Sequence, residues 1–437
     1  MAQPAKILLT LTGLIIGESK ESWPRQSIMQ TITPERIEVS SERLSFLDNA
    51  LQRYVDQGKV AGIVAVLSRR GQVFHARGYG AANLSTHQHM QPDTLVRLWS
   101  ITKVITAVAT LICYERGEFV LDQPIADFIP AFGSTLVYAG MEGDEPRFAK
   151  QERPITIRHL LTHTGGIPSG FGGATEPPEG MLRARIQALK TSHISVAKIV
   201  ETIAQVPLVA QPNTLWRYGQ SFEILARLVE ITSGLPFADF LQTYIFDPLG
   251  MTDTSYVIGD DRIDRFSAFY RRAQDGSLSL LEAPSQSVHY TSNGHRPPGQ
   301  WQHGGAGLVS TASDIQRLGN MLLNRGTLDK VRILAPSTVD LMTTNHLRAD
   351  LLPYHFPNAQ PIYGYGHGLG VHTLMDRGLA GTPSANGEYW KDGGSGTLLW
   401  VDPHYELVGT VCYQLDPFWI YPIFATTKAL TYQAILA

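Results

Sequence analysis

The pattern of apolar and polar positions changes along the chain. Residues 41–57 place four apolar side chains at helical spacing, which predicts an amphipathic helix. Gly62–Ser68 is apolar and β-branched, and a turn leads from it into Gln72–Tyr79, so this segment predicts a β-hairpin. Residues 101–116 repeat apolar positions three, four and seven apart and stop at a glycine, which predicts a second helix.

The middle of the chain is rich in loops and helical patterns. The clearest helices are predicted over Val196–Ala204, Phe222–Thr232 and Pro236–Ile245. A further helix is predicted over Asp314–Arg325, with Ser313 or Asp314 near its N-cap.

Strand patterns return in the C-terminal part. Thr397–Val401 and Leu407–Tyr413 flank an Asp-Pro turn and predict a second hairpin, and residues 422–437 end the chain in a helix. Because strands fall at both ends and helices in the middle, we expect an α+β fold. We assign residues 41–117 and 301–437 to an α/β sheet domain, 118–300 to an inserted, mostly helical domain, and 1–40 to an N-terminal extension.

Composition indicates a soluble, enzyme-sized protein. The chain has 437 residues, of which 43% are apolar and 17% charged, so neither a disordered chain nor a coiled coil is expected. The formal net charge of −3 gives no support to a nucleic-acid or anionic-membrane partner. Cys113 and Cys412 can form neither a disulfide framework nor a cysteine-rich metal site, and we expect buried free thiols.

The N-terminal apolar run is too short to cross a membrane. Ile7–Ile16 has the length of a signal-peptide core, but only Lys6 precedes it as a positive residue, and the Gly-Glu-Ser that follows is a poor cleavage site. We favour a peripheral element or a loosely held leader over an export signal at residues 1–19, and a cytoplasmic location over export. No other stretch is long and apolar enough to predict a transmembrane helix.

The sequence favours a serine nucleophile outside the G-x-S-x-G pattern. No serine has glycine two positions before and two positions after it, which argues against an α/β-hydrolase. The alternative S-x-x-K pattern places an amine beside a hydroxyl on one helix face, and it occurs at Ser100/Lys103 and at Ser195/Lys198. Ser195 has an ordinary explanation as a helix N-cap. Lys103 instead falls on an otherwise apolar helix, where a buried lysine is costly unless it is paired or neutral.

Longer segments around these residues carry a family pattern. They are LVRLWSITK (95–103), IRHLLTHTGGIPSG (157–170), LWRYGQSFEILARLVEITSG (215–234), YIFDPLGMTDTSY (244–256), HGGAGLVSTASDIQRLGNMLL (303–323) and GEYWKDGGSGTLLWVDP (387–403). The chain resembles the serine β-lactamase and penicillin-binding-protein superfamily over most of residues 45–437. Within it, the chain is most similar to the class C-like esterases called family VIII carboxylesterases. The resemblance implies a β-lactamase-like fold, with an antiparallel sheet flanked by helices.

The resemblance also implies a tyrosine partner for the serine. In this family the tyrosine comes from a Y-x-N or Y-S-x motif, and Tyr218-Gly219-Gln220 stands at the matching place. Gln220 replaces the Asn that β-lactamases usually carry, which puts efficient lactam recognition in doubt more than ester cleavage. Without the family, Tyr218 would be interpreted as a packed aromatic side chain with its hydroxyl hydrogen-bonded.

A third box of the family is K-T-G in β-lactamases and W-G-G in many of the esterases. Lys391-Asp392-Gly393 matches it. Lys391 restores the basic residue, whereas Asp392 replaces the hydroxyl. Asp392 should disfavour a carboxylate on the substrate, or it could pair with Lys391 and neutralise it. A solvated turn holding a Lys–Asp pair is the structural alternative.

The resemblance implies catalysis through an acyl-enzyme on Ser100. Lys103 and Tyr218 would share the work of the general base, and the sequence leaves open which of them takes the proton. The backbone N–H groups of Ser100 and Gly394 would hold the oxyanion. Further residues are assigned to substrate binding: Lys391, Gly393, Gln220, Trp99 and Trp390.

Two other patterns are given a structural interpretation. His159 and His163 are four apart but lack the glutamate of H-E-x-x-H, so we expect no metal site, and no cofactor is expected either. His303–Gly307 precedes a helix, and we interpret it as a tight turn rather than an oxyanion loop.

We therefore expect a carboxylesterase that acts on short to medium acyl esters. The alternatives are, in order, a β-lactamase or D-amino-acid peptidase, an acyltransferase that uses the same acyl-enzyme, and a scaffold or sensor that is acylated without turnover. Gln220 and Asp392 favour the esterase. The expected partner is a small-molecule ester, and the expected assembly is a monomer or a weak oligomer.

Overall fold

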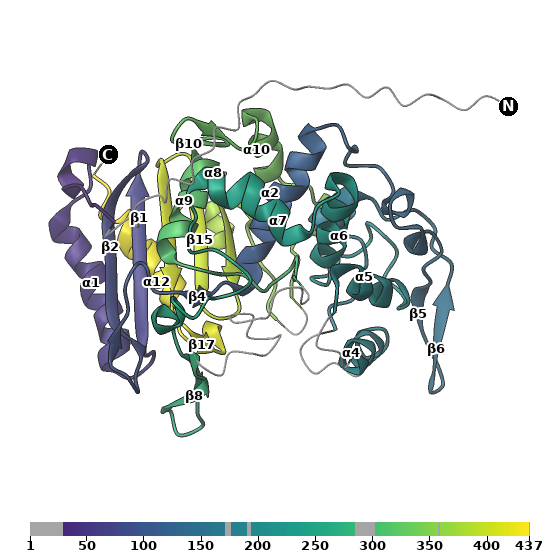
Figure 1. Ribbon diagram of the computed structural model, residues 1–437, viewed down its shortest axis with the longest axis horizontal. Helices are drawn as coiled ribbons and strands as arrows, with labels where there is room; N and C mark the ends of the chain where they lie inside the picture. Colours follow the sequence, from purple (N-terminus) through teal and green to yellow (C-terminus); the bar gives the residue numbers. More distant parts are fainter. Residues whose placement is uncertain (1–28, 171–175, 190–193, 285–301, 357–358, 437) are drawn as a thin grey trace.

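An antiparallel sheet covered by helices forms one side of the molecule, and a mostly helical region forms the other (Figure 1). The figure shows a computed structural model of the chain, which describes residues 29–170, 176–189, 194–284, 302–356 and 359–436. The apolar run at residues 7–16 lies outside the described residues. Within them, no helix is both long enough and apolar enough to cross a bilayer.

The main sheet has eight strands in the described part of the chain, in the order β12-β13-β14-β15-β16-β1-β2-β3, and all neighbours are antiparallel. In chain order these strands are β1 (Gly62–Arg69), β2 (Gln72–Asn83), β3 (Gln88–His89), β12 (Tyr365–His367), β13 (His372–Leu374), β14 (Tyr389–Gly393), β15 (Thr397–Asp402) and β16 (Leu407–Cys412). Both predicted hairpins are present, and the pairing of β1 with β16 joins them at the centre of the sheet.

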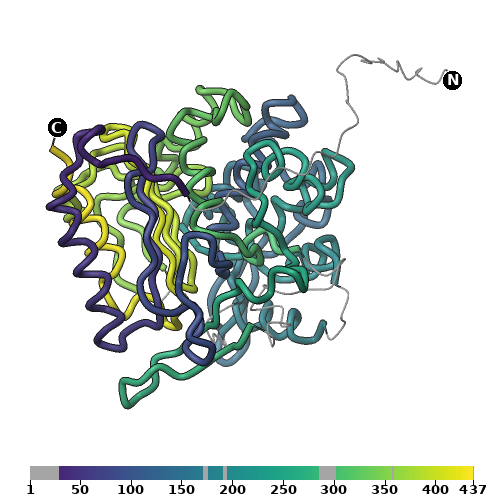
Figure 2. The backbone as a smooth tube through the Cα atoms, turned by 60° about the vertical axis from the view of Figure 1, so that its left-hand side comes forward, coloured from purple at the N-terminus to yellow at the C-terminus, as the bar shows by residue number. Residues whose placement is uncertain are grey.

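The alternation of side chains along β1 separates two apolar layers. Ile63, Ala65 and Leu67 pack in one cluster with α1 (Ser41–Asp56) and α12 (Ile423–Tyr432), which lie side by side on the outer face (Figure 2). Val64 and Val66 face the other way, into the cluster that holds α2 (Thr102–Glu115), α6 (Ser221–Ser233) and α9 (Ala312–Leu323). A period of two therefore gives β1 buried residues on both faces.

Helix α2 runs through the centre of the molecule. Every residue from Thr102 to Cys113 is buried, and α2 packs against α6 of the helical region. Polar groups on such a helix must find partners inside the protein. Thr106 does so by donating its hydroxyl to the carbonyl of Gly304 at 2.6 Å.

The remaining elements surround this core. The helices are α3 (Ile157–Leu161), α4 (Glu179–Ala188), α5 (Val196–Ala204), α7 (Phe237–Leu241), α8 (Asp247–Leu249), α10 (Pro336–Thr343) and α11 (Arg377–Ala380). The minor strands are β4 (Val96–Arg97), β5 (Val137–Glu142), β6 (Glu145–Ala149), β7 (Phe269–Arg272), β8 (Leu278–Glu282), β9 (Val309–Ser310), β10 (Thr327–Leu328), β11 (Val331–Arg332) and β17 (Leu415–Asp416). The architecture confirms the predicted α+β class, whereas the boundaries of the inserted domain stay a prediction.

Two predicted helix starts are wrong. The helix expected over residues 101–116 begins at Thr102, because a short 3-10 turn occupies Trp99–Ile101. The N-cap of α9 is Thr311, and neither of the two residues proposed from the sequence takes that place. The side chain of Thr311 accepts the N–H of Asp314 at 3.1 Å, so the cap lies before the predicted start.

Two predicted helix ends also differ. The helix expected to stop at Ile245 continues through a π-helical turn into α8 and ends at Gly250, which has a left-handed backbone. The C-terminal helix, expected to reach residue 437, ends at Tyr432, because Ile435 pairs with Val39 in an antiparallel bridge. In each case a backbone feature outside the apolar pattern sets the end of the helix.

Gly319 of α9 offers a test of the packing between this helix and the sheet. A Cβ there would lie 2.5 Å from Cγ1 of Val408 on β16 and 2.8 Å from Cδ1 of Leu399 on β15. We predict that Gly319→Ala destabilises the protein by about 1–3 kcal/mol in urea unfolding, because overpacking outweighs the better helix propensity of Ala. A variant as stable as the wild type would contradict this packing.

Candidate active site

Ser100 lies at the sharp turn between β4 and α2. The turn residues Trp99–Ile101 precede the first turn of the buried helix. Trp99 has a φ of +47°, in the left-handed region that non-glycine residues rarely adopt. Such a turn brings the chain from the strand to the helix N-terminus in four residues, 98–101, and Ser100 within it is only partly buried.

Lys103 lies one helical turn further on, inside the protein. Its Nζ is 3.4 Å from Ser100 Oγ and donates to the carbonyl of Gly305 at 2.6 Å. The residue is only 5% exposed. Burial, with help from the charge of Lys391, lowers the pKa of Lys103 to about 7, although Glu223 and Asp392 act in the opposite direction. A substantial neutral fraction of the amine is therefore present near neutral pH.

Tyr218 completes the contacts to the serine. Its hydroxyl donates to Ser100 Oγ at 2.6 Å, and Lys103 Nζ lies 4.7 Å from the centre of its ring. Burial raises the pKa of Tyr218 above its ordinary value, so the phenol stays protonated at neutral pH. The structure thus brings together the three residues that the sequence analysis assigned to the nucleophile and its base.

The loop before α6 holds Tyr218 in place. A Cβ at Gly219 would lie 2.2 Å from the carbonyl oxygen of Ile167, so the two backbones approach as closely as glycine allows. The buried side chain of Gln220 donates to the carbonyl of Ser169 at 2.8 Å. Gln220 therefore ties this loop to its neighbour, and its predicted part in substrate binding stays a prediction.

Lys391 lies on β14 beside the same tyrosine. It is 2% exposed, and its Nζ lies 5.1 Å from the centre of the Tyr218 ring and 3.3 Å from Asp392 Oδ1. Burial lowers the pKa of Lys391, and the ion pair with Asp392 partly restores it. The Lys–Asp pair foreseen from the sequence is present, but it is a largely buried pair within the site and not a solvated turn.

His372 is a site residue that the sequence analysis missed. Its Nε2 is 3.2 Å from Lys391 Nζ, and its Nδ1 is 2.6 Å from the hydroxyl of Tyr354, which also donates to Gly366 at 3.2 Å. Burial, helped by the charge of Lys391, lowers the pKa of His372 well below its ordinary value. A neutral ring with its proton on Nδ1 satisfies all of these contacts. No motif pointed to this residue.

The turn after β14 is bound to the segment that carries Ser100. Ser395 Oγ donates to the carbonyl of Arg97 at 2.6 Å, and Thr397 Oγ1 donates to that of Leu98 at 3.0 Å. A Cβ at Gly393 would lie 2.0 Å from the oxygen of Leu98, and one at Gly394 would lie 2.9 Å from the ring of Trp99. The backbone of Gly394 is therefore next to the residue that precedes Ser100, where the oxyanion site was predicted.

An aromatic wall lines the site behind Tyr218. The ring of His163 lies 4.6 Å from that of Tyr218, and the ring of Phe356 lies 5.0 Å from it. Burial lowers the pKa of His163 well below its ordinary value, so this histidine is neutral. Trp99 contacts the ring of Phe269 at 6.2 Å, whereas Trp390 stacks on His372 at 4.3 Å. The proposed place of both tryptophans in an acyl pocket stays a prediction.

The other candidates from the sequence have structural roles. Ser195 caps α5 by accepting the N–H of Lys198 at 3.1 Å. His159 closes the capping box of α3, and no group of three or more potential metal ligands occurs among the described residues. Cys113 and Cys412 are both buried free thiols, as expected.

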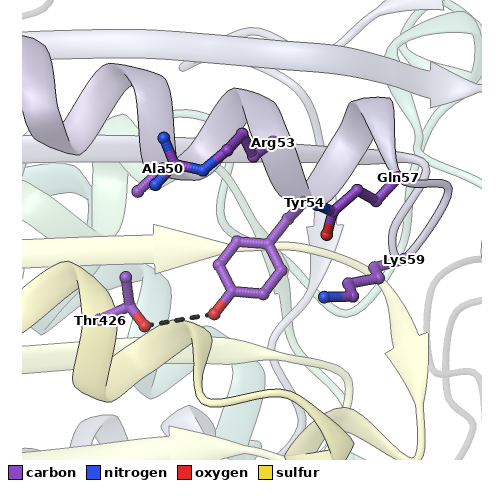
Figure 3. Close-up of a pocket in the computed structure, with 6 residues that line it drawn as sticks. All are labelled: Ala50, Arg53, Tyr54, Gln57, Lys59 and Thr426. Carbon is purple, nitrogen blue, oxygen red and sulfur yellow. Dashed lines mark hydrogen bonds between the residues drawn. The ribbon is translucent and has the colours of Figure 1, made fainter.

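A separate pocket lies on the outer face of the sheet. It is lined by Ala50, Arg53, Tyr54, Gln57, Lys59 and Thr426, and the hydroxyls of Tyr54 and Thr426 are 3.2 Å apart across it (Figure 3). Because α1 and α12 cover the face opposite to α2, this pocket is separated from Ser100 by the sheet.

A comparison with family models identifies the fold. The beta-lactamase model matches residues 47–419, which is most of the chain. The chain belongs to the beta-lactamase family. Ser100, Lys103 and Tyr218 therefore come together in a protein of the family for which the sequence motifs predicted acylation of a serine.

Relatives within the beta-lactamase family include esterases and acyltransferases. Esterase EstB of Burkholderia gladioli is 29% identical over 82% of this chain and 86% of its own length. Monacolin J acid methylbutanoyltransferase of Aspergillus terreus is 28% identical over 87% and 92%. The solved structure of EstCE1, described as a hydrolase with promiscuous acyltransferase activity, matches with a TM-score of 0.74 at 23% identity, over 90% of this chain and 99% of that one. The protein is an enzyme of the serine hydrolase superfamily.

The lowered pKa of Lys103 predicts a stability effect that depends on pH. Between the folded pKa of about 7 and the ordinary value of 10.5, the unfolded chain binds more protons than the folded one, so stability rises with pH in this window. The difference in unfolding free energy between Lys103→Met and the wild type should therefore favour the variant most below about pH 7, and this difference should shrink towards pH 10. Urea unfolding at several pH values measures this difference. The matched control is Lys198→Met on the surface, and the same pH trend in both variants would contradict the assignment.

Proposed function

We propose that the protein hydrolyses carboxylic esters through an acyl-enzyme on Ser100. The observation that carries the proposal is the position of Ser100 Oγ, 2.6 Å from the Tyr218 hydroxyl and 3.4 Å from the buried Nζ of Lys103. A serine hydroxyl becomes a useful nucleophile when a group beside it can accept its proton.

Lys103 is the proposed general base for acylation. Its pKa of about 7 gives it a free lone pair at neutral pH, while one of its N–H bonds is used on the carbonyl of Gly305. As Ser100 Oγ bonds to the ester carbonyl carbon, its proton passes to Nζ. The Tyr218 hydroxyl stays protonated and can supply a proton to the leaving alkoxide, and Lys103 then returns the proton it took from Ser100 to the tyrosine through a water.

Deacylation reverses these roles. After the alcohol leaves, a water takes its place, gives a proton to the same base, and bonds to the acyl carbon. The bond between Ser100 Oγ and that carbon breaks, and Lys103 gives the serine oxygen the proton it took from the water. In both steps the N–H groups of Ser100 and Gly394 would bind the negative oxygen, a type of contact worth about 2.7–4 kcal/mol in other serine enzymes.

The residues near Ser100 favour an uncharged acyl group. Asp392 lies 3.3 Å from the ammonium of Lys391, so this cation is already paired and the carboxylate would repel a negative substrate. Aromatic rings, including those of Tyr218 and Phe356, provide an apolar wall. These features support esters of short to medium acyl chains over lactams, which carry a carboxylate.

Acyl transfer to an alcohol is the second candidate. It uses the same acyl-enzyme, with the acceptor hydroxyl in the place of water, and relatives of about the same identity are named for each activity. Assays of the purified protein with p-nitrophenyl esters of increasing chain length and with a chromogenic cephalosporin separate the hydrolytic candidates. Adding a small alcohol acceptor and quantifying the new ester measures transfer. A cephalosporin rate equal to that of the best ester would overturn the proposal.

Replacing the nucleophile gives the direct test of the site. We predict that Ser100→Ala lowers kcat for p-nitrophenyl butyrate by about 10³-fold or more, with the fold intact, because the acyl-enzyme cannot form. Ser195→Ala is the matched control, since it alters the other S-x-x-K pair. It should lose only about 1 kcal/mol of stability through its helix cap and keep its activity. Turnover that persists in Ser100→Ala would refute the assignment.

The role of Asp392 predicts a change of substrate charge preference. Asp392→Asn removes the carboxylate that pairs with Lys391, so the ammonium becomes available to a carboxylate on the acyl chain. The ratio of kcat/KM for p-nitrophenyl hemisuccinate to that for the butyrate should rise about tenfold, which corresponds to about 1.4 kcal/mol. The two esters have acyl chains of equal length, so the ratio reports charge alone. An unchanged ratio would show that Asp392 does not select against anions.

A further inference from the structure

A buried carboxylate lies behind the proposed base. Glu223 of α6 is 2% exposed, and its two oxygens accept the backbone N–H groups of Gly304 and Gly305, both at 3.0 Å. The ring nitrogen Nδ1 of His303 is 3.5 Å from Oε1. A carboxylate in the interior is costly unless such partners satisfy it. Its presence next to the proposed base therefore indicates a role in the site.

The turn that Glu223 holds also contacts α2. The carbonyl of Gly305 accepts from Lys103 Nζ at 2.6 Å, and the carbonyl of Gly304 accepts from Thr106 Oγ1 at 2.6 Å. The N–H groups of the turn thus point to α6 and its carbonyls point to α2. A Cβ at Gly304 would lie 2.1 Å from the carbonyl oxygen of Phe222, so the turn is held close to α6.

Glu223 is close enough to act on the lysine by charge as well. A Cβ at Gly305 would lie 3.0 Å from Glu223 Oε1 and 3.1 Å from Lys103 Nζ, which places both groups beside the same glycine. Burial would raise the pKa of Glu223, but His303 and the two N–H groups hold it below the ordinary value, so the carboxylate is charged. Its charge opposes the fall in the pKa of Lys103 that burial and Lys391 cause.

We propose that Glu223 is a positioning residue for Lys103, which it orients through the turn at Gly304 and Gly305. The carboxylate fixes the two N–H groups, the turn presents the carbonyl of Gly305, and this carbonyl binds one N–H of the amine so that its lone pair is directed at Ser100. The negative charge keeps the amine from losing its basicity altogether. This inference rests on the proposed function, since it concerns the base of that reaction.

The titration of Lys103 depends on groups from several elements. Those that act on it are Tyr218 before α6, Glu223 on α6, Lys391 and Asp392 on β14, and His163 after α3, while His303 in the turn contacts Glu223. Substitution of Glu223 removes both a hydrogen bond that holds the turn and a negative charge that acts on Lys103.

Glu223→Gln is the informative variant. The amide cannot accept both N–H groups, so the turn and the Gly305 carbonyl should shift, and kcat for p-nitrophenyl butyrate should fall about 10²-fold. KM should change little, because no substrate contact is removed. The acid limb of the kcat/KM profile should move down by about one pH unit from its wild-type position, since a negative charge near Lys103 is lost.

Thr106→Val is the matched control. It removes the hydrogen bond from the Thr106 hydroxyl to the Gly304 carbonyl, which also holds this turn, and it changes no charge. It should lower kcat and leave the acid limb where it is in the wild type. Glu223→Asp keeps the carboxylate but shortens the side chain by one methylene. It too should lower kcat, and it should shift the acid limb of the kcat/KM profile less than Glu223→Gln does.

The outcomes separate this proposal from the proposed function. If Ser100→Ala is inactive but Glu223→Gln keeps the wild-type kcat and acid limb, the positioning role is refuted while the acyl-enzyme stands. A fall in kcat with an unshifted limb, as in Thr106→Val, would reduce Glu223 to a packing residue and also overturn the proposal. If circular dichroism shows that Glu223→Gln does not fold, Glu223→Asp is the test of the positioning role. A wild-type kcat in Glu223→Asp would then refute that role.

Discussion

The burial of one amine beside Ser100 is the constraint on which the rest of the site depends. A charged lysine is disfavoured in the interior of a protein. Burial therefore lowers the pKa of Lys103 to about 7, with help from the charge of Lys391. It keeps a fixed position because the carbonyl of Gly305 accepts one of its N–H bonds. The same burial that would destabilise a structural lysine therefore suits this one to the proposed role of a base at neutral pH.

The fold brings this amine its neighbours from distant parts of the sequence. The turn before the central helix α2 supplies Ser100, and the first turn of α2 supplies Lys103. Tyr218 precedes α6, and strand β14 supplies Lys391. Side-chain hydrogen bonds from the turn after β14 and from the first residue of β15 reach the carbonyls just before Ser100, which links these inner strands to the segment that carries Ser100. These contacts join elements that are each packed into the core, and short turns between those elements hold Ser100 and the Gly305 carbonyl in place.

Sequence patterns predicted those parts of the molecule that have a local signature. The hairpins, the buried helix and α5 follow from periodicity, and Ser100, Lys103, Tyr218 and Lys391 follow from motifs and a family resemblance. Thr311 as the cap of α9 and the early end of α12 depend on backbone geometry and on a distant bridge.

The missed residues act through contacts between distant segments. His372 meets Lys391 across neighbouring strands, and no motif marks it. Glu223 in the first turn of a helix has an ordinary explanation in the helix dipole, so the sequence alone does not indicate its contact with the turn at Gly305.

The most direct test of the whole account is the rate at which an ester acylates the enzyme, measured by rapid quenching and peptide mass spectrometry as a function of pH. We expect the adduct on the peptide that contains Ser100, formed at a rate that rises with pH to a plateau with a midpoint near the Lys103 pKa of about 7. An adduct on another residue, or a rate that does not vary between about pH 5.5 and 8.5, would contradict it.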